Sequence, residues 1–316
     1  LLPATSISPA KPSILKFHLL ETLLFRKISS SYRILEMRDL IDIHIHHYPE
    51  AAQLDPLGWA RARNELYWGD LVTSGPQGWA SEAKLIADMD SAGCQTSVIQ
   101  GWYWQHNKTC AEQNLFLTQV ARESNDGLES GIDLLEASAA DGAIGIGELH
   151  PGVQQFSLKS DLWLGICDWA ARHHWPILLH VTETVGHEYK GRVDTNLSDY
   201  VWMAKRCPQN RFILAHWGGG LPFYMLNHAV KKALQNVWFD TAASPLVYDK
   251  RVWKTVIDLI GAERIVFGSD YPLRMYPKLN DKPEMMRLIA EAVDCIECES
   301  DRVQIFSVNT RKILGI

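Results

Sequence analysis

Three features are scarce in this chain of 316 residues, and each scarcity narrows what the protein can do. No apolar run reaches the length of a bilayer-spanning helix, so the sequence predicts no membrane partner. Positive charge is not in excess, because 31 Lys and Arg residues stand against 37 Asp and Glu residues. Without a basic patch, we expect no nucleic-acid partner and no binding to an anionic membrane surface.

Cysteine is the third scarce feature, and its spacing predicts no disulfide framework. The six residues are Cys94, Cys110, Cys167, Cys207, Cys295 and Cys298. Only the last two form a CxxC pair, and no second pair or histidine cluster accompanies it, which argues against a zinc site there. A chain of this length can bury a large core without disulfides, so a reduced, cytoplasmic location fits best.

Residues 1–36 differ in composition from the rest of the chain. They carry Ser, Lys and Arg among scattered apolar residues, and Glu21 and Glu36 are their only acids. We expect a leader or extension outside the fold, with Met37 as the natural start, although an organelle transit peptide has a similar composition. Residues 37–316 are then expected to form one domain.

The stretch at residues 41–47 reads as a strand with an unusual polar face. Isoleucine alternates strictly with Asp42, His44 and His46, and a period of two with β-branched residues is typical of a strand. Histidines at i and i+2 lie on one face, close enough for both to reach one metal ion. A half-exposed strand with polar residues facing water explains the same pattern, so the choice depends on the rest of the chain.

Apolar strands alternate with helical segments along most of the sequence, which indicates βαβ units and a parallel sheet. The expected strands lie at 41–46, 96–100, 143–148, 176–181, 211–216, 237–240 and 264–270. The expected helices lie at 82–92, 109–122, 132–140, 162–174, 197–207, 224–234, 251–260, 284–293 and 301–314.

This series favours an α/β fold of the closed (β/α)8 TIM barrel type. A doubly wound sheet would more often show a glycine-rich phosphate loop after its first strand, where this chain has histidines. No strand is readable between residues 100 and 143, so we expect a barrel distorted at its third strand. The long connection from Tyr48 to Gly78 is expected to be a functional loop.

The ends of the expected strands carry the candidate chemistry, because catalytic groups of such barrels lie at the carboxyl-terminal ends of several strands. The candidate metal ligands among them are His44, His46, Glu148, His180, His216 and Asp270. Asp240, at the end of the strand at 237–240, is expected instead to support one of the histidines by a hydrogen bond. A single histidine that closes a strand is more often structural. Five strand ends of this kind are harder to explain that way, because buried ionisable groups are unfavourable unless paired or metal-bound.

These residues and their flanking motifs resemble the amidohydrolase superfamily. Beside the His44-x-His46 pair, the segments 147–151 (GELHP), 215–219 (AHWGG) and 267–272 (FGSDYP) are similar to its amidohydrolase 2 branch. That branch includes the aminocarboxymuconate-semialdehyde decarboxylase-like proteins. The resemblance covers about residues 40–316, and it is specific for the superfamily but weak for the substrate.

The resemblance implies a divalent metal as cofactor, with zinc as the first choice and manganese or another ion as an alternative. His44, His46, His180 and Asp270 are similar to the ligands of one such ion. Asp270 would also take the proton of the metal-bound water, whose pKa zinc lowers to roughly 7.

The same resemblance leaves the number of metal ions open between one and two. His216 would either polarise the substrate and orient the water or bind a second metal. Glu148 resembles the bridging carboxylate of two-metal relatives such as the TatD-type nucleases, although a supporting or substrate-contacting role stays open.

Substrate contacts are expected from aromatic rings and from the loop after residue 180. The rings, which suggest a flat or cyclic substrate, are Trp102, Tyr103, Trp104 and Trp217. The loop residues that could contact a carboxylate or carbonyl group are His187, Tyr189 and Lys190. The aromatic rings could equally well be part of the hydrophobic core. The three loop residues could equally well belong to a polar loop that faces water.

Three functions are compatible with the sequence. The first is a metal-dependent hydrolase that cleaves an amide, lactone or ester bond of a small organic molecule, and Glu148 favours it. The second is a metal-dependent, non-oxidative decarboxylase of a small cyclic or muconate-like acid. The third is a non-catalytic metal-binding barrel, against which the filled ligand positions argue. We expect a small-molecule partner, and the resemblance implies a homodimer because relatives are often dimers.

Overall fold

The computed structural model describes residues 39–121, 135–136, 139–140, 142–186, 188–193 and 195–316. The expected leader at 1–36 lies outside these residues, and so does most of the helix expected at 132–140. His187, an expected substrate contact, also lies outside them.

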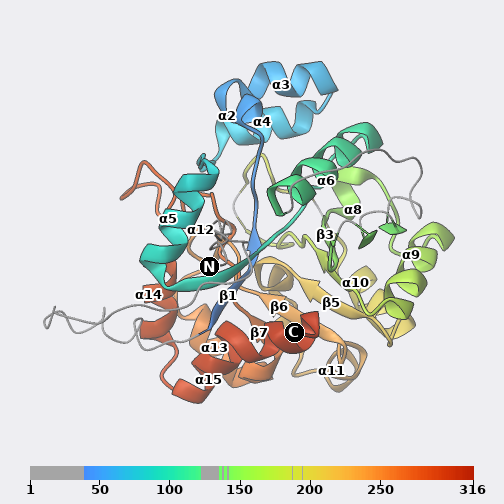
Figure 1. Cartoon of the computed structure of the whole chain (residues 1–316). Coiled ribbons are helices and arrows are strands. Elements are labelled where there is room, and N and C mark those ends of the chain that lie inside the picture. The colour runs from blue at the N-terminus through green and yellow to red at the C-terminus, as the bar shows by residue number, and fades with distance from the viewer. Residues whose placement is uncertain (1–38, 122–134, 137–138, 141, 187, 194) are drawn as a thin grey trace, which may run out of the picture.

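In the described part of the chain, seven short parallel strands form the centre of the fold (Figure 1). They are β1 (Leu40–Ile45), β2 (Cys94–Ile99), β3 (Ile146–Leu149), β4 (Pro176–Leu179), β5 (Arg211–Leu214), β6 (Val237–Asp240) and β7 (Ile265–Val266). β1 pairs with β2, and β3 to β7 form a second sheet in chain order. Every expected strand is present, which confirms the α/β class, although β7 is much shorter than the expected 264–270.

Backbone hydrogen bonds join the two sheets at both edges, so the strands enclose a barrel. Beside β7, the amide of Ile43 donates to the carbonyl of Phe267 at 2.9 Å. Beside β2, the amide of Gly101 donates to the carbonyl of Gly147, and the amide of Glu148 donates to the carbonyl of Gly101, each at 2.7 Å. The predicted barrel class is therefore confirmed, with seven strands in two sheets among the described residues where a closed barrel of eight was predicted.

The expected distortion at the third strand lies at this second junction. Among the described residues, no strand separates β2 from β3, and the two meet directly. Two glycines make the close approach feasible. A Cβ atom on Gly101 would lie 3.0 Å from the carbonyl oxygen of Gly147, and one on Gly147 would lie 2.6 Å from Oε1 of Gln100. Side chains at these positions would force the strands apart.

Helices surround the strands (Figure 1). They are α5 (Glu82–Ala92), α6 (Asn107–Ala121), α8 (Pro151–Gln154), α9 (Asp161–Arg172), α10 (Leu197–Arg206), α11 (His228–Ala233), α12 (Ser244–Val247), α13 (Val252–Ile260), η2 (Ala262–Arg264), α14 (Met286–Cys295), α15 (Glu299–Val303), η3 (Gln304–Val308) and α16 (Asn309–Leu314). The predicted bounds of α5 are confirmed, because the Ser81 hydroxyl accepts from the amide of Lys84 and Gly93 ends the helix in a left-handed conformation.

The prediction of a helix at 224–234 was wrong at its start. α11 begins only at His228, because the residues that follow β5 form a 3-10 segment, η1 (His216–Tyr224). Gly218, Gly219 and Gly220 have φ values of 57°, 60° and 90°, which glycine adopts without steric cost. The glycine run therefore turns the chain tightly at the end of β5, and the helix starts later than its apolar pattern predicted.

The connection from Tyr48 to Gly78 is helical rather than an irregular loop, which corrects the prediction. It contains α2 (Glu50–Leu54), α3 (Pro56–Arg63) and α4 (Leu66–Ser74), which stand above the barrel in Figure 1. These helices are too short to show a clear hydrophobic period. They hold together through a cluster of buried rings that includes Trp59, Trp68 and Trp104.

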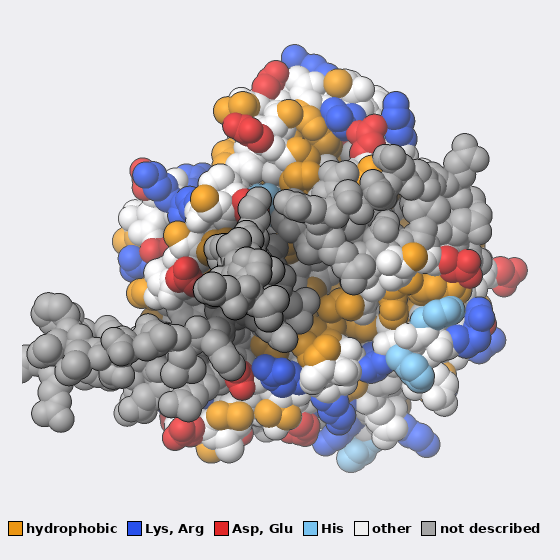
Figure 2. Space-filling view, viewed as in Figure 1, with side chains coloured by type: hydrophobic (Ala, Val, Ile, Leu, Met, Phe, Trp, Pro, Cys, Tyr) orange, Lys and Arg blue, Asp and Glu red, His pale blue; other side chains and the backbone are white. Residues whose placement is uncertain are grey.

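The main core lies between the barrel and its outer helices, and its largest fully buried side chains are Trp163, Trp169, Trp217 and Trp253. Among the described helices, none is both long and apolar enough to cross a membrane. On the face shown in Figure 2, basic and acidic side chains are interspersed rather than gathered into one patch.

Candidate metal centre

β1 places two histidines side by side at the open end of the barrel. The alternation of the strand turns Asp42, His44 and His46 to its inner face. Nε2 of His44 lies 3.1 Å from Nε2 of His46, and both rings are buried. Two ring nitrogens aimed at one point are favourable only if a proton or a cation lies between them.

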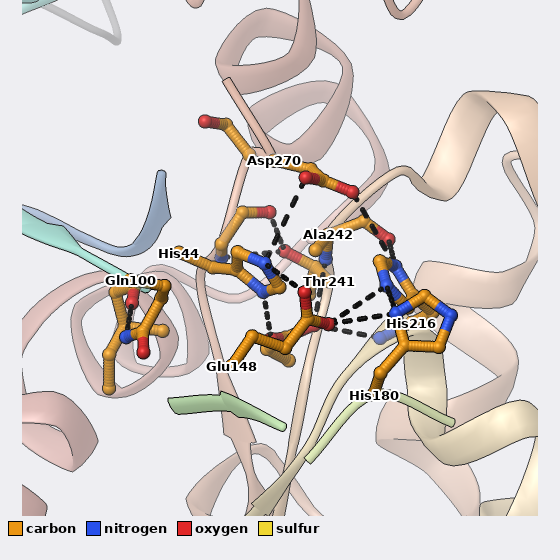
Figure 3. A network of polar contacts seen from close by, with 12 residues as sticks. His44, Gln100, Glu148, His180, His216, Thr241, Ala242 and Asp270 are labelled. Atoms are coloured by element: carbon orange, nitrogen blue, oxygen red, sulfur yellow. Dashed lines mark hydrogen bonds and ion pairs between the residues drawn. The ribbon is translucent and has the colours of Figure 1, made fainter. Parts of the chain in front are cut away.

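Four more candidate residues come from the ends of other strands and point at the same place (Figure 3). Parallel strands bring their carboxyl-terminal ends to one face of a barrel, so positions far apart in sequence meet there. The six side chains form two groups whose ligand atoms lie within 4.8 Å of one another inside each group, namely His44, His46 and Asp270, and then Glu148, His180 and His216.

Glu148 is the side chain that connects the two groups. Its Oε2 lies 3.7 Å from Nε2 of His44 and 3.5 Å from Nε2 of His46. Its Oε1 lies 2.9 Å from Nδ1 of His180 and 3.5 Å from Nε2 of His216. One oxygen of the carboxylate thus faces each group.

Asp270 lies on the other side of the centre. Its Oδ1 is 3.5 Å from Nε2 of His46, and its Oδ2 is 3.8 Å from Nδ1 of His216. Its φ of 64° is left-handed, and its amide donates to the carbonyl of His44 at 2.8 Å. A conformation that is uncommon for a side-chain-bearing residue is therefore fixed next to β1, as often occurs at functional sites.

The histidines of the centre are also held from behind. Oδ2 of Asp240 lies 2.8 Å from Nδ1 of His44, as the sequence suggested for a residue that supports a histidine. Nδ1 of His46 lies 3.3 Å from the carbonyl of Gln100, and Nδ1 of His216 lies 3.1 Å from that of Ala242. These contacts orient the rings and leave Nε2 of each ring for the centre. The two carbonyl groups could not be predicted from the sequence, because any residue type carries a backbone acceptor.

His150 supports His180 by stacking, a role that the GELHP motif did not reveal. Its ring lies parallel to that of His180, with 4.6 Å between ring centroids and 16° between the planes. Its Nδ1 accepts from the amide of Gly152 at 3.1 Å. Burial, together with the charge of His180, lowers the pKa of His150 to about 2, so its ring is neutral.

Opposite charges dominate the electrostatics of the metal-free centre. Burial alone would raise the pKa of Glu148, but the charges of His180 and His44 hold it well below its usual range. Burial opposes protonation of His44, yet Asp240 and Glu148 raise its pKa well above the ordinary value. Burial also opposes protonation of His216, but a hydrogen bond to Glu148 and the charge of Asp270 raise its pKa to about 9.

The donor set fits a divalent metal. Imidazole nitrogens and carboxylate oxygens are the ligands that such ions take in proteins. The facing rings of His44 and His46 lie next to carboxylate oxygens of Glu148 and Asp270, and one shared cation satisfies these nitrogens and oxygens better than separate protons do. Because the protonated histidines would have to lose their protons, metal binding is expected to release protons and to weaken as the pH falls.

A cavity of about 470 Å³ opens onto the centre and is mostly apolar. The candidate residues that line it are His46, Trp102, Tyr103, Glu148, His180, Tyr189, His216 and Asp270. Trp104 and Trp217 are not among the described residues of its wall. Trp104 packs in the ring cluster beneath α2–α4, and Trp217 is buried with its indole N–H donating to Ser244 at 2.6 Å. Lys190 forms an exposed ion pair with Asp70.

Asp42 gives a prediction about stability. This carboxylate lies below the histidines on β1, its Oδ1 accepts from the amides of His44 and Ser269, and its Oδ2 has no partner among the described residues. Burial raises its pKa from 3.8 to about 7. Because the folded state then binds a proton that the unfolded state has lost, stability should fall as the pH rises between these values.

We therefore expect Asp42→Asn to remove this pH dependence. Between pH 5 and pH 8, the free energy of unfolding of the wild type should fall relative to the variant by about 2.5 kcal/mol. Urea unfolding of both proteins with excess chelator measures it, since chelation keeps metal loss out of the comparison. Parallel pH profiles of the two proteins would contradict the prediction.

Comparisons with known proteins agree with this architecture. A family model described as amidohydrolase matches residues 41–316. No curated protein matches the chain in sequence.

Several solved structures are similar in fold at low sequence identity. A 5-carboxyvanillate decarboxylase from Novosphingobium aromaticivorans, in complex with manganese and 4-hydroxy-3-methoxy-5-nitrobenzoic acid, has a TM-score of 0.63 at 12% identity and covers 88% of this chain and 96% of its own. A dihydroxybenzoic acid decarboxylase from a Polaromonas species, with manganese and 2-nitroresorcinol, has a TM-score of 0.56 at 16% identity, covering 88% and 97%. The IDCase of Metarhizium anisopliae has a TM-score of 0.61 at 18% identity, covering 92% and 99%.

Proposed function

Because the chain belongs to the amidohydrolase family, as its motifs predicted, we propose that it is a metal-dependent hydrolase of an amide, lactone or ester bond in a small molecule. The observation that carries this proposal is the position of Glu148. Its carboxylate turns one oxygen to His44 and His46 and the other to His180 and His216. Such an arrangement suits two ions a short distance apart, as two-metal hydrolases require.

Different residues of the chain would have different roles in hydrolysis. Divalent ions bound by the two groups would supply Lewis acidity and a water molecule of lowered pKa. Asp270 reaches both groups, so its carboxylate is placed to accept a proton and return it to the leaving group. His216 has its Nδ1 held by a backbone carbonyl, so only its Nε2 faces the centre. With two ions this nitrogen would be a ligand of the second, and with one ion its protonated form would be placed to hydrogen-bond the developing oxyanion.

A metal-dependent, non-oxidative decarboxylase is the second candidate. Trp102 and Tyr103 stack with 4.1 Å between ring centroids and stand in the wall of the cavity beside His46. Flat walls of this kind suit a planar acid. The solved structures support this candidate better than the first, since two of the three above are decarboxylases of aromatic acids with manganese bound.

An assay that follows both reactions decides between the candidates. Metal-loaded protein is incubated with a panel of amides, lactones and esters, and separately with hydroxylated benzoic acids, while acid release and carbon dioxide are measured. We expect hydrolysis that chelator abolishes and that metal restores. His180→Ala should lose the ion of its own group and its turnover, whereas the exposed His228→Ala should keep its metal content and its turnover. Carbon dioxide release without hydrolysis would overturn the first candidate in favour of the second.

A further inference from the structure

We infer that Arg274 binds a carboxylate of the substrate, so that the substrate is a molecule with an anionic group away from its reacting bond. Arg274 follows β7 and Asp270 in the chain and lies in the cavity wall. Of the described residues that line the cavity, it is the only Lys or Arg. This inference takes one premise from the proposed function, namely that the reacting bond of the substrate lies at the metal centre. The anionic group is inferred from Arg274 alone.

The guanidinium of Arg274 is free to take a ligand. The amide of Arg274 donates to the carbonyl of Pro76 at 2.8 Å, which fastens the loop without the side chain. Nε makes one long contact to the same carbonyl, at 3.4 Å. Within the described part of the chain, the two Nη groups have neither a hydrogen-bond partner nor a carboxylate partner.

Two arginines with a structural role, the buried Arg302 and the half-buried Arg264, behave differently. Nε of Arg302 donates to the carbonyl of Ile296 at 2.7 Å and its Nη2 to that of Glu297. Both Nη groups of Arg264 donate to carbonyls at the end of α11. In these two arginines backbone carbonyls occupy the terminal nitrogens of the guanidinium, whereas those of Arg274 have no such partner among the described residues.

The charges around the cavity explain why an anionic substrate needs such a group. Glu148, Glu183 and Asp270 all line the cavity, and each would repel a carboxylate. Metal ions would offset the charge at the centre only. Glu183 follows β4 and Arg274 follows β7, so strands β5 and β6 separate them around the barrel. A carboxylate of the substrate is therefore favoured on the side of the cavity that carries Arg274 and disfavoured on the side that carries Glu183.

The shape of guanidinium selects the kind of anion. Its planar fork presents two parallel N–H donors that match both oxygens of a carboxylate. The cavity-lining residues next to it in the chain, Pro272, Leu273 and Pro277, are apolar. A small molecule with an apolar body, one carboxylate at Arg274 and its reacting bond at the metal centre satisfies all of these contacts.

Equilibrium binding of two simple acids tests the inference apart from turnover. Titration calorimetry on the metal-loaded protein compares isophthalate, which has two carboxylates, with benzoate, which has one. We expect isophthalate to bind about tenfold more tightly. Arg274→Gln should abolish this ratio while benzoate binding stays unchanged, and Arg274→Lys should restore part of it. Arg287→Gln, at an exposed arginine paired with Glu284, is the matched control.

The outcomes separate this inference from the proposed function. An unchanged isophthalate-to-benzoate ratio in folded, metal-loaded Arg274→Gln would overturn the role of Arg274, whatever reaction the enzyme performs. Loss of the ratio in the variant supports the inference even if no hydrolysis is found. Loss of benzoate binding together with isophthalate binding would show a damaged centre and would also count against a separate anion site.

Discussion

Glu148→Gln should bind one divalent ion per chain where the wild type binds two, and its turnover should fall on the order of 10²–10⁴-fold. The carboxylate is buried, and its two oxygens face two different pairs of histidines. An amide has the same shape but no negative charge, and it presents a single oxygen. The amide therefore cannot offer an oxygen ligand to both groups of histidines. The group that faces the amide nitrogen is expected to lose its ion. Plasma mass spectrometry of dialysed protein measures the ions, and initial rates measure the turnover.

Glu183→Gln is the matched control for this experiment. Glu183 is also a buried carboxylate of the cavity, but it lies in the wall outside both groups and accepts from the Tyr189 hydroxyl at 3.4 Å. The control should keep both ions. Two ions retained in Glu148→Gln would show that Glu148 does not connect the sites. One ion in the wild type would favour a single-metal centre and, with it, the decarboxylase candidate.

The proximity of the candidate ligands could be predicted from the sequence, because a barrel brings residues that are far apart in the chain to one end of its strands. A period of two puts His44 and His46 on one face of β1, and parallel strands bring Glu148 and Asp270 to the same end. Neither inference needs side-chain packing. The identity of strand ends was therefore enough to gather these residues, although their roles as ligands remain predictions.

The division of the centre into two groups could not be predicted in the same way. The resemblance assigned His180 to one ion with His44 and His46. In the structure, its Nδ1 lies 2.9 Å from Glu148 and 3.1 Å from Nε2 of His216. The orientation of the His180 ring depends on stacking against His150, a contact between side chains that spacing along the chain does not encode.

The directions of the aromatic side chains could not be predicted from spacing along the chain either. Trp102, Tyr103 and Trp104 are consecutive, yet the first two line the cavity and the third packs beneath α2–α4. Irregular backbone turns neighbouring side chains in directions that no periodic rule supplies. Arg274 was missed for a related reason, because the loop after β7 has no periodic pattern that would assign the side chain of Arg274 to the cavity wall.

Asp270→Asn should lower turnover on the order of 10²–10⁴-fold even at saturating metal. The asparagine keeps the shape and the amide hydrogen bond to His44, and it tolerates the left-handed φ of 64° at this position as well as aspartate does. The fold should therefore persist. What the variant loses is the charge near His46 and His216 and the ability to accept a proton. Rates measured across a metal titration separate these two losses.

If Asp270 acted only as a ligand, added metal would restore the rate of Asp270→Asn to that of the wild type. If it moves a proton, as proposed, the rate stays low when the metal sites are full, and the limb of the pH profile that reports the basic group disappears. Asp249→Asn changes an exposed aspartate outside the centre and should leave the rate unchanged. A saturated Asp270→Asn rate within tenfold of the wild type would contradict the proton role. Asp270 would then contribute metal affinity alone, and the proton would have to pass through His216.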